Sequence, residues 1–223
     1  MQTMRVLRDH PARAAAVFLL ALLLLTPADV PLSQMFYRAG VGFTWSADGL
    51  LEFVRATIPD LVIGTFAACL LLWIASLLNP RLPWRVTTPQ ISFLATTLIV
   101  GPGLIIETLL KPNWGRARPK DISAFGGEAA YTPPWQMAHE CDHNCSFVSG
   151  HAAIAFWMTA YAFLLPPRWR TAGLLAGLLF GFAIGAVRIV QGAHFFTDVV
   201  AAGLIVLVVN EICAALFLTR TPA

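Results

Sequence analysis

Long apolar segments separated by polar ones dominate the chain. Six of them approach the roughly 20 mostly apolar residues that a membrane-spanning helix needs. They are residues 14–30, 61–78, 91–110, 147–165, 171–190 and 195–219. The first is the weakest, because Pro27 interrupts it. The pattern predicts an all-α polytopic membrane protein with six transmembrane helices and a single domain over residues 1–223.

Two longer polar stretches separate the predicted helices. Residues 31–59 contain LLEFVRATI, which suggests a short helix lying on the membrane surface. Residues 112–146 are rich in Gly, Pro and acidic residues. Only 12% of the chain is charged, against about 25% in an ordinary soluble domain. The net charge of +3 is too small to indicate a nucleic-acid partner.

The placement of arginines predicts the orientation, because cytoplasmic segments carry an excess of Lys and Arg. With both termini in the cytoplasm, eight of the 15 basic residues lie there: Arg5, Arg8, Arg13, Arg81, Arg85, Arg168, Arg170 and Arg220. The first segment is compatible with an uncleaved anchor or a cleaved signal peptide. We favour the anchor, because no convincing small-residue cleavage site follows it. Five outer basic residues need another explanation: Lys111, Arg116, Arg118, Lys120 and Arg188.

Polar side chains gather at the outer ends of the predicted helices. Lys111 ends the third helix and Arg188 ends the fifth. The fourth helix opens with Ser149, Gly150 and His151. The sixth opens near His194 and Asp198, and Arg118 lies in the long outer loop. Because ionisable groups near membrane depth usually face a protein interior or a water-filled cavity, we expect one common site at the outer face.

The chemistry of one part of this set matches a phosphate group. Lys111, Arg118 and Arg188 supply positive charge, and arginine forks match phosphate oxygens two at a time. The Ser149 hydroxyl can donate a hydrogen bond. The backbone N–H groups of Gly150 and His151 begin a helix, where unpaired donors and the helix dipole favour an anion. These residues predict a phosphate cradle.

The other part of the set is reactive. His194 and Asp198 are four residues apart and share one helix face, so Asp198 can accept the Nδ1–H of His194. That bond would leave Nε2 free as a nucleophile. His151 arrives from another helix and could protonate the departing oxygen.

Two further features of the outer side have alternative interpretations. Cys141 and Cys145 could form a disulfide, which we favour, or join nearby histidines in a zinc site. Glu107 could pair with Lys111 one helical turn later, or be an unrelated interfacial carboxylate.

Three segments together carry a family resemblance. They are KPNWGRARP (residues 111–119), VSGH (residues 148–151) and RIVQGAHFFTD (residues 188–198). Their order and spacing resemble the signature of the type 2 phosphatidic acid phosphatase superfamily, whose membrane members have six helices. The resemblance implies a lipid phosphatase that works without a metal or other cofactor. Two positions depart from the usual pattern: Val148 stands where proline is common, and Val187 where serine is common.

The resemblance also assigns roles to residues. Lys111, Arg118 and Arg188 would hold the phosphate, with hydrogen bonds from Ser149 and Gly150. His194 would be phosphorylated with the assistance of Asp198, and His151 would be the acid for the leaving group. For Arg116 and Lys120, a second phosphate or head group and the membrane surface are equal alternatives.

The stretch CDHNCSFVSGH (residues 141–151) is similar to bacterial lipid A phosphatases. This implies a phosphorylated lipid substrate and a multi-pass protein of the bacterial inner membrane with a periplasmic active site. Other members of the superfamily cleave undecaprenyl pyrophosphate, phosphatidylglycerol phosphate or phosphatidic acid. Two readings from other classes are an intramembrane serine protease using Ser149 and His194, and a lipid transporter. The protease has no use for three cations, and the chain lacks the two matching halves typical of transporters. The sequence does not indicate an oligomeric state.

Overall fold

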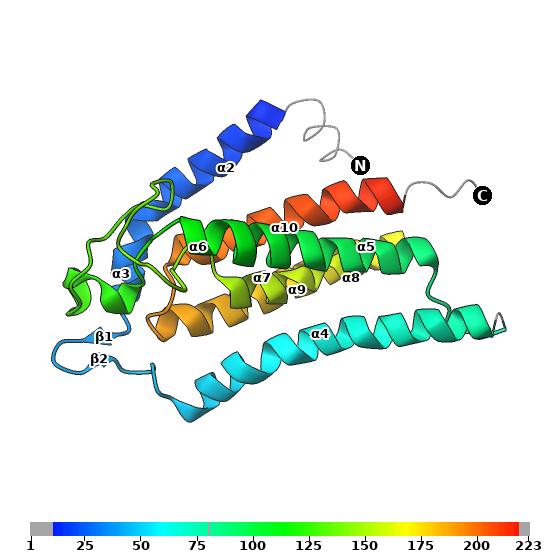
Figure 1. Ribbon diagram of the computed structural model, residues 1–223, viewed down its shortest axis with the longest axis horizontal. Coiled ribbons are helices and arrows are strands. Elements are labelled where there is room, and N and C mark those ends of the chain that lie inside the picture. The colour runs from blue at the N-terminus through cyan, green and yellow to red at the C-terminus, as the bar shows by residue number, and fades with distance from the viewer. Residues whose placement is uncertain (1–10, 80, 219–223) are drawn as a thin grey trace.

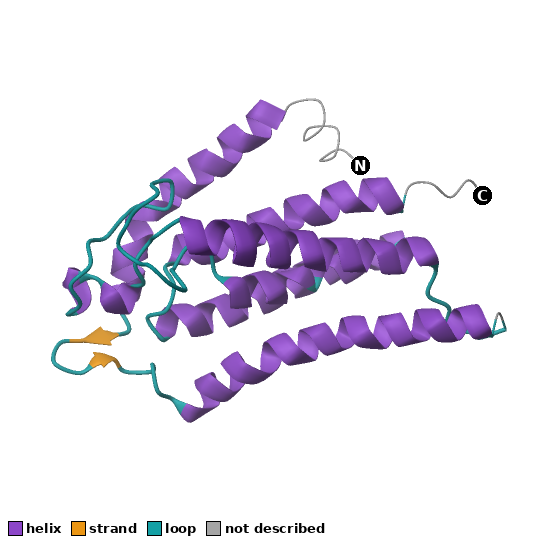
Figure 2. Cartoon of the chain, viewed as in Figure 1, coloured by secondary structure: helices purple, strands orange, loops and turns teal. Residues whose placement is uncertain are grey.

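The computed structural model describes residues 11–79 and 81–218, with side chains from residue 16 onward. The helices lie roughly side by side in an elongated bundle, with irregular loops gathered at one end (Figures 1 and 2). The elements are α2 (Pro11–Leu25), the 3₁₀ turn η1 (Thr26–Ala28), α3 (Asp29–Gln34), β1 (Tyr37–Arg38), β2 (Gly42–Phe43), α4 (Gly49–Leu78), α5 (Thr88–Leu98), the π-helical segment η2 (Ile99–Leu110), α6 (Lys111–Asn113), η3 (Pro119–Asp121), η4 (Ser123–Phe125), α7 (Gly150–Trp157), α8 (Thr159–Ala162), α9 (Pro167–Val190) and α10 (Phe196–Phe217). Predicted features at Arg5, Arg8, Thr219 and Arg220, and the side chain of Arg13, lie outside the described residues.

The predicted helical membrane protein is confirmed in outline. Five stretches of the described chain are long and apolar enough to cross a membrane: Ala16–Gln34, Gly49–Leu78, Thr88–Asn113, Pro167–Val190 and Phe196–Phe217. The fourth predicted span, residues 147–165, is not a single long helix but two consecutive short ones, α7 and α8. This pair lies inside the bundle, where Phe156 and Trp157 are fully buried.

The second span begins earlier than its hydrophobic pattern suggested. The prediction that LLEFVRATI forms a separate surface helix is wrong, because these residues are the first turns of α4. Asp48 fixes the start by accepting a 3.0 Å hydrogen bond from the backbone N–H of Leu51, as an N-cap residue does. Pro59 lies within the helix without ending it.

The third span runs from α5 through η2 to α6. A hydrogen bond of 2.9 Å from the backbone N–H of Thr87 to the Gln90 side chain caps its start. Around Pro102 the helix continues with π-helical geometry. Local adjustments of this kind are a common way for a membrane helix to accommodate proline. The helix therefore carries Lys111 unbroken to the loop end of the bundle.

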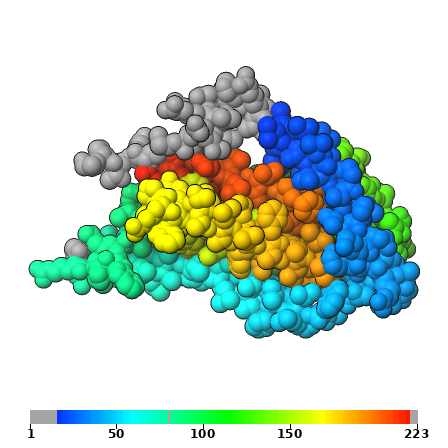
Figure 3. Space-filling model, turned by 180° about the vertical axis from the view of Figure 1, so that it is seen from behind, coloured from blue at the N-terminus to red at the C-terminus, as the bar shows by residue number. Residues whose placement is uncertain are grey.

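Glycines let α9 approach its neighbours closely. A Cβ on Gly181 would lie 2.1 Å from a ring carbon of Phe156 in α7, and one on Gly185 would lie 2.3 Å from a methyl of Val199 in α10. Small residues at helix interfaces permit such close approach in membranes. The same packing places the C-terminal end of α9 beside the start of α10. Seen from behind, α9 lies between α4 and α10, and α2 diverges from α10 (Figure 3).

The two ends of the bundle differ. The connections from α4 to α5 and from α8 to α9 lie at one end, and the long loop after α6 lies at the other (Figure 1). The first end carries Arg81, Arg85, Arg168 and Arg170. The starts of α7 and α10 lie at the loop end, as does the end of α9, so the topology brings the predicted site residues together.

Candidate active site

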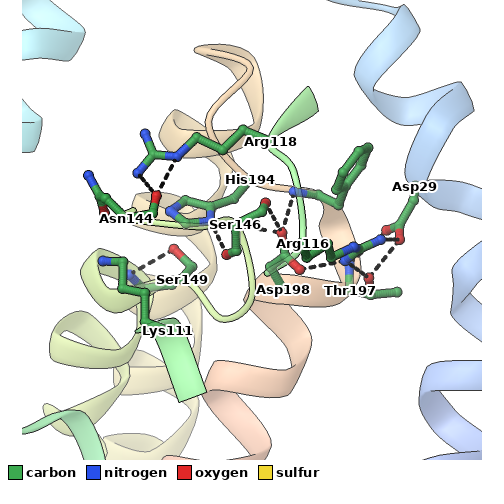
Figure 4. Close-up of polar contacts among 12 residues, drawn as sticks. Asp29, Lys111, Arg116, Arg118, Asn144, Ser146, Ser149, His194, Thr197 and Asp198 are labelled. Carbon is green, nitrogen blue, oxygen red and sulfur yellow. Dashed lines mark hydrogen bonds and ion pairs between the residues drawn. The ribbon is translucent and has the colours of Figure 1, made fainter. Parts of the chain in front are cut away.

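The start of α7 forms one wall of the site. Ser149 is its N-cap, and its hydroxyl oxygen accepts a 3.4 Å hydrogen bond from the backbone N–H of Ala152. The backbone N–H of Ser149 donates to the carbonyl oxygen of Asp198 at 3.3 Å. This bond attaches the first turn of α7 to α10, as the position of Ser149 in Figure 4 illustrates.

Gly150 provides close access to this helix start. A Cβ there would lie 1.8 Å from Oε1 of Glu107 and 3.3 Å from the ammonium nitrogen of Lys111. The Lys111 nitrogen donates to both carboxylate oxygens of Glu107, at 3.0 and 3.2 Å. Of the two alternatives for Glu107, pairing with Lys111 is therefore observed, and it directs the ammonium group toward the first turn of α7.

Arg118 and Arg188 bring two more cations to the same place. The guanidinium of Arg118 donates twice to the backbone carbonyl of Asn144, at 3.0 and 2.6 Å, and burial lowers its pKa. Arg188 is only 7% exposed and donates to the side chain of Gln191. Within the described residues its Nε–H has no hydrogen-bond partner. A buried donor of this kind would be satisfied by an anion.

A disulfide holds the loop that carries Asn144. Cys141 and Cys145 are bonded, with 5.6 Å between their Cα atoms. The disulfide alternative is thus the observed one, and the two sulfurs are bonded to each other rather than free as thiolate ligands for zinc. The link constrains the backbone carbonyl that accepts from Arg118.

His194 is buried, with 1% of its surface exposed. Its Nδ1 lies 2.7 Å from the backbone carbonyl oxygen of Ser146, but 3.8 Å from the nearest carboxylate oxygen of Asp198. The predicted direct bond between the two side chains is therefore wrong: a main-chain carbonyl is the direct partner. Burial lowers the pKa of His194, an effect that the charge of Asp198 opposes. The ring is neutral at neutral pH, and Nε2 is the nitrogen left for chemistry.

The carboxylate of Asp198 accepts hydrogen bonds from donors other than His194. Its carboxylate accepts from the Ser146 hydroxyl at 2.5 Å, from the backbone N–H of Phe195 at 2.8 Å and from Arg116 at 2.5 Å. Its role toward His194 runs through Ser146, which it holds in place.

Arg116 has neither of the roles predicted for it. It is completely buried and forms ion pairs with two carboxylates, Asp198 at 2.5 Å and Asp29 at 2.8 Å. It also donates to the backbone carbonyl of Thr132 at 2.8 Å, and its guanidinium lies 4.4 Å from the centre of the Phe195 ring. These neighbours exclude both a lipid head group and the membrane surface as its partner. Lys120, by contrast, is exposed.

The eight predicted site residues therefore converge at one end of the bundle. His151 lies within electrostatic range of Arg188, His194 and Lys111, and Arg188 within range of Arg118. Sequence reasoning missed Asp29 and Ser146. An isolated carboxylate in the first apolar segment was a usable signal for Asp29, because such groups in membrane helices have partners. Ser146 offered none, since it acts through its backbone.

Comparison with known proteins agrees with this geometry. A lipid A 4′-phosphatase of Francisella tularensis subsp. novicida is 32% identical over 190 residues, which cover 84% of this chain and 85% of that protein. A lipid A 4′-phosphatase of Rhizobium leguminosarum is 38% identical over 122 residues, 54% of this chain and 52% of the relative. A lipid A 1-phosphatase of Rhizobium etli is 33% identical over 130 residues, 54% and 51% of the two chains. The chain thus spans about half the length of these two Rhizobium proteins.

No solved structure matches the chain significantly. The profile of the PAP2 superfamily matches residues 90–222, which include all eight residues of the site. The chain therefore belongs to the PAP2 superfamily and is a phosphoric monoester hydrolase of the membrane that acts on phosphorylated lipids.

Proposed function

We propose that the protein removes a phosphate from lipid A at the periplasmic face of the bacterial inner membrane, through a phosphohistidine intermediate. The observation that carries this proposal is a buried, neutral His194 whose Nδ1 already has a partner, with Arg118 and Arg188 facing it and Lys111 at the adjacent start of α7. The Francisella relative, 85% of whose length is covered by the match to this chain, is named a lipid A 4′-phosphatase. The 4′-phosphate is therefore the proposed target.

In the first step, Nε2 of His194 attacks phosphorus and the bond between phosphorus and the lipid oxygen breaks. His151 protonates that oxygen as it leaves. Lys111, Arg118 and Arg188 neutralise the three other phosphoryl oxygens, and the N–H groups at the start of α7 add hydrogen bonds.

In the second step, His151 takes a proton from a water molecule, which attacks the phosphohistidine. The bond between phosphorus and nitrogen breaks, inorganic phosphate is released, and His194 returns to its neutral form. Positioning and charge compensation are the main demands of phosphoryl transfer, and the site residues supply both.

The packing supports a complete six-helix topology with one domain. α7 starts at the loop end of the bundle, and the connection from α8 to α9 lies at the other end (Figure 1). We therefore infer that α7 and α8 together cross the membrane, in addition to the five long spans. Four arginines mark the end opposite the site: Arg81, Arg85, Arg168 and Arg170. By the positive-inside rule that end is cytoplasmic, which supports a periplasmic site and cytoplasmic termini.

The test is phosphate release by the purified protein from bis-phosphorylated lipid A, undecaprenyl pyrophosphate and phosphatidylglycerol phosphate, with mass spectrometry of the products. We expect loss of the 4′-phosphate of lipid A and an acid-labile phosphoprotein with radiolabelled substrate. His194→Ala should abolish both. Release from undecaprenyl pyrophosphate alone would contradict the lipid A assignment, and near-normal turnover by His194→Ala would contradict the phosphohistidine.

The same preparation separates the phosphatase from the other enzyme class. A serine protease loses all activity in Ser149→Ala, whereas a phosphatase that uses Ser149 only for phosphate binding is weakened. Vanadate should inhibit the phosphatase, because it mimics the pentacoordinate phosphorus of the transition state.

A further inference from the structure

Asp29 and Arg116 have no part in the chemical steps proposed above, yet they form a completely buried ion pair, as Arg116 and Asp198 do. Both side chains have 0% exposure. Such a pair is costly to desolvate and adds little to stability compared with apolar packing. A role beyond stability is therefore worth seeking.

We propose that Arg116 and Asp29 are positioning residues that set the orientation of His194 for attack on phosphorus. This inference rests on the proposed function, because it assigns the two residues to the phosphorylation of His194. They act through two intermediates, Asp198 and Ser146, which Figure 4 shows between the ion pair and the imidazole.

The connection is a continuous series of short contacts. Asp29 binds one side of the Arg116 guanidinium at 2.8 Å, and Asp198 binds the other at 2.5 Å. The second oxygen of Asp198 accepts from the Ser146 hydroxyl at 2.5 Å. The carbonyl oxygen of Ser146 lies 2.7 Å from Nδ1 of His194.

Arg116 also holds Ser146 through the main chain. The backbone N–H of Ser146 donates to the carbonyl oxygen of Arg116 at 2.8 Å. Ser146 is thus held through its N–H by Arg116 and through its hydroxyl by Asp198, so the direction of its carbonyl is determined on both sides. That direction fixes the plane of the imidazole and keeps the proton on Nδ1, which leaves the Nε2 lone pair for phosphorus.

Asp29 anchors this assembly to the N-terminal helix pair. It accepts from the backbone N–H of Thr197 at 2.8 Å and from the Thr197 hydroxyl at 2.6 Å. The Tyr131 hydroxyl donates to it at 3.3 Å, and burial together with the charge of Asp29 raises the pKa of Tyr131 to about 12, so this donor stays protonated. α3 therefore supports the site although it contributes no group that would touch substrate.

The charge balance favours the same role. Asp198 is the carboxylate nearest the ring, with one oxygen 3.8 Å from Nδ1 of His194, and its other oxygen is held by Arg116. The imidazole gains positive charge as Nε2 bonds to phosphorus. A fixed negative field beside it stabilises that state without any rearrangement during the reaction.

The experiment compares Asp29→Asn, Ser146→Ala, Arg116→Lys and Arg116→Gln with the wild-type protein, using full-length protein in detergent. The measurements are kcat, KM and the single-turnover rate of phosphohistidine formation, each per folded protein. We expect Asp29→Asn and Ser146→Ala to lower kcat and phosphohistidine formation about 10- to 100-fold, with little change in KM. Arg116→Lys should retain a higher kcat than Arg116→Gln, because lysine keeps the positive charge. It should still fall below the wild type, because lysine lacks the planar guanidinium that bonds Asp29 and Asp198 together.

Asn210→Ala is the matched control. It removes a buried hydrogen bond of 3.0 Å to Thr159 in the middle of the bundle, so it should lower the melting temperature and leave kcat unchanged. If Asp29→Asn and Ser146→Ala keep wild-type kcat, the inference is overturned even if the Arg116 variants fail to fold. If the wild-type protein forms no phosphohistidine, the proposed function fails instead.

Discussion

At the residue scale, one hydrogen bond to a main-chain carbonyl fixes the tautomer of His194. The ring is 1% exposed and its Nδ1 is 2.7 Å from the oxygen of Ser146. A carbonyl can only accept, so Nδ1 must carry the proton. The neutral ring therefore presents an unprotonated Nε2, the form that can attack phosphorus.

This environment predicts where His194 titrates. Asp198, Arg188 and Arg118 face the ring, and burial, the largest effect, lowers its pKa below the ordinary value of 6.5. Because the neutral form is the nucleophile in the proposed mechanism, the site should remain active with respect to this group below pH 6.5. Histidine NMR in detergent should show a midpoint below 6.5 for the signal that disappears in His194→Gln. A midpoint at or above 6.5 would contradict the burial argument.

Arg188 allows a second prediction at this scale. Its buried Nε–H lacks a partner within the described chain and is expected to bind a phosphoryl oxygen. Arg188→Gln should lower kcat/KM about 10²- to 10³-fold, as loss of one well-placed donor typically does. Arg168→Gln, at the opposite end of the bundle, is the control and should retain wild-type kcat/KM. Equal activity of the two variants would remove Arg188 from the site.

At the scale of elements, the geometry of the first turn of α7 determines which groups face the candidate site. Ser149 caps the helix, and Gly150 leaves the space in front of the N–H groups open. Lys111 reaches this point because the third span continues through Pro102 to the loop end. The Lys111 ammonium group and the start of α7, which are far apart in sequence, thus lie side by side.

Gly150→Ala tests whether that space is used. Its methyl group would displace only the flexible end of Glu107, so the protein should fold. The methyl would, however, lie 3.3 Å from the Lys111 nitrogen, where the phosphate should bind. Since a displacement of about 1 Å can cost about 100-fold in rate, kcat/KM should fall by a similar factor at an unchanged melting temperature.

Gly64→Ala provides the comparison for this variant. A Cβ there meets nothing within 4 Å, and the residue lies in α4. It should match the wild-type protein in activity and melt no lower than the wild type, because alanine favours a helix interior over glycine. A Gly150→Ala protein as active as Gly64→Ala would show that the phosphate does not approach this helix start.

At the scale of the whole molecule, the candidate site lies at one end of the bundle and Arg81, Arg85, Arg168 and Arg170 lie at the other, and the orientation in the bilayer determines which end faces the periplasm. Single cysteines at two exposed positions test this: Glu128→Cys in the long loop and Trp84→Cys between α4 and α5. In intact cells with a permeable outer membrane, a membrane-impermeant maleimide should label the first and not the second. The unaltered protein corrects for labelling of Cys69 and Cys213. The reverse pattern would place the site in the cytoplasm.

The sequence predicted much of the fold because hydrophobic length and helix-end residues are local properties. Four of the six predicted spans correspond to long helices, and the first corresponds to α2 and α3 together. The third and fifth spans extend beyond their predicted bounds by a few residues, α4 starts at residue 49 instead of 61, and α10 lies within its predicted bounds. The surface helix was misjudged, because residues 49–60 contain charges that break the hydrophobic pattern although the helix continues through them. The interruption between α7 and α8 was missed, because it depends on how the helices pack, and an uninterrupted apolar composition does not reveal it.

The sequence by itself determined that the chain spans a membrane and that Lys111, Arg118, Ser149, Gly150, His151, Arg188, His194 and Asp198 belong to one end of it. Alternation of spanning segments places helix ends on one side or the other, and this requires no knowledge of packing. Only the tertiary structure decided the partners within that end. It gave His194 a carbonyl partner, Arg116 two buried carboxylates and Glu107 its bond to Lys111. A polar group that packing removes from water must bond to whichever donor or acceptor lies next to it. Which group that is depends on how the helices pack, and the sequence alone does not give this.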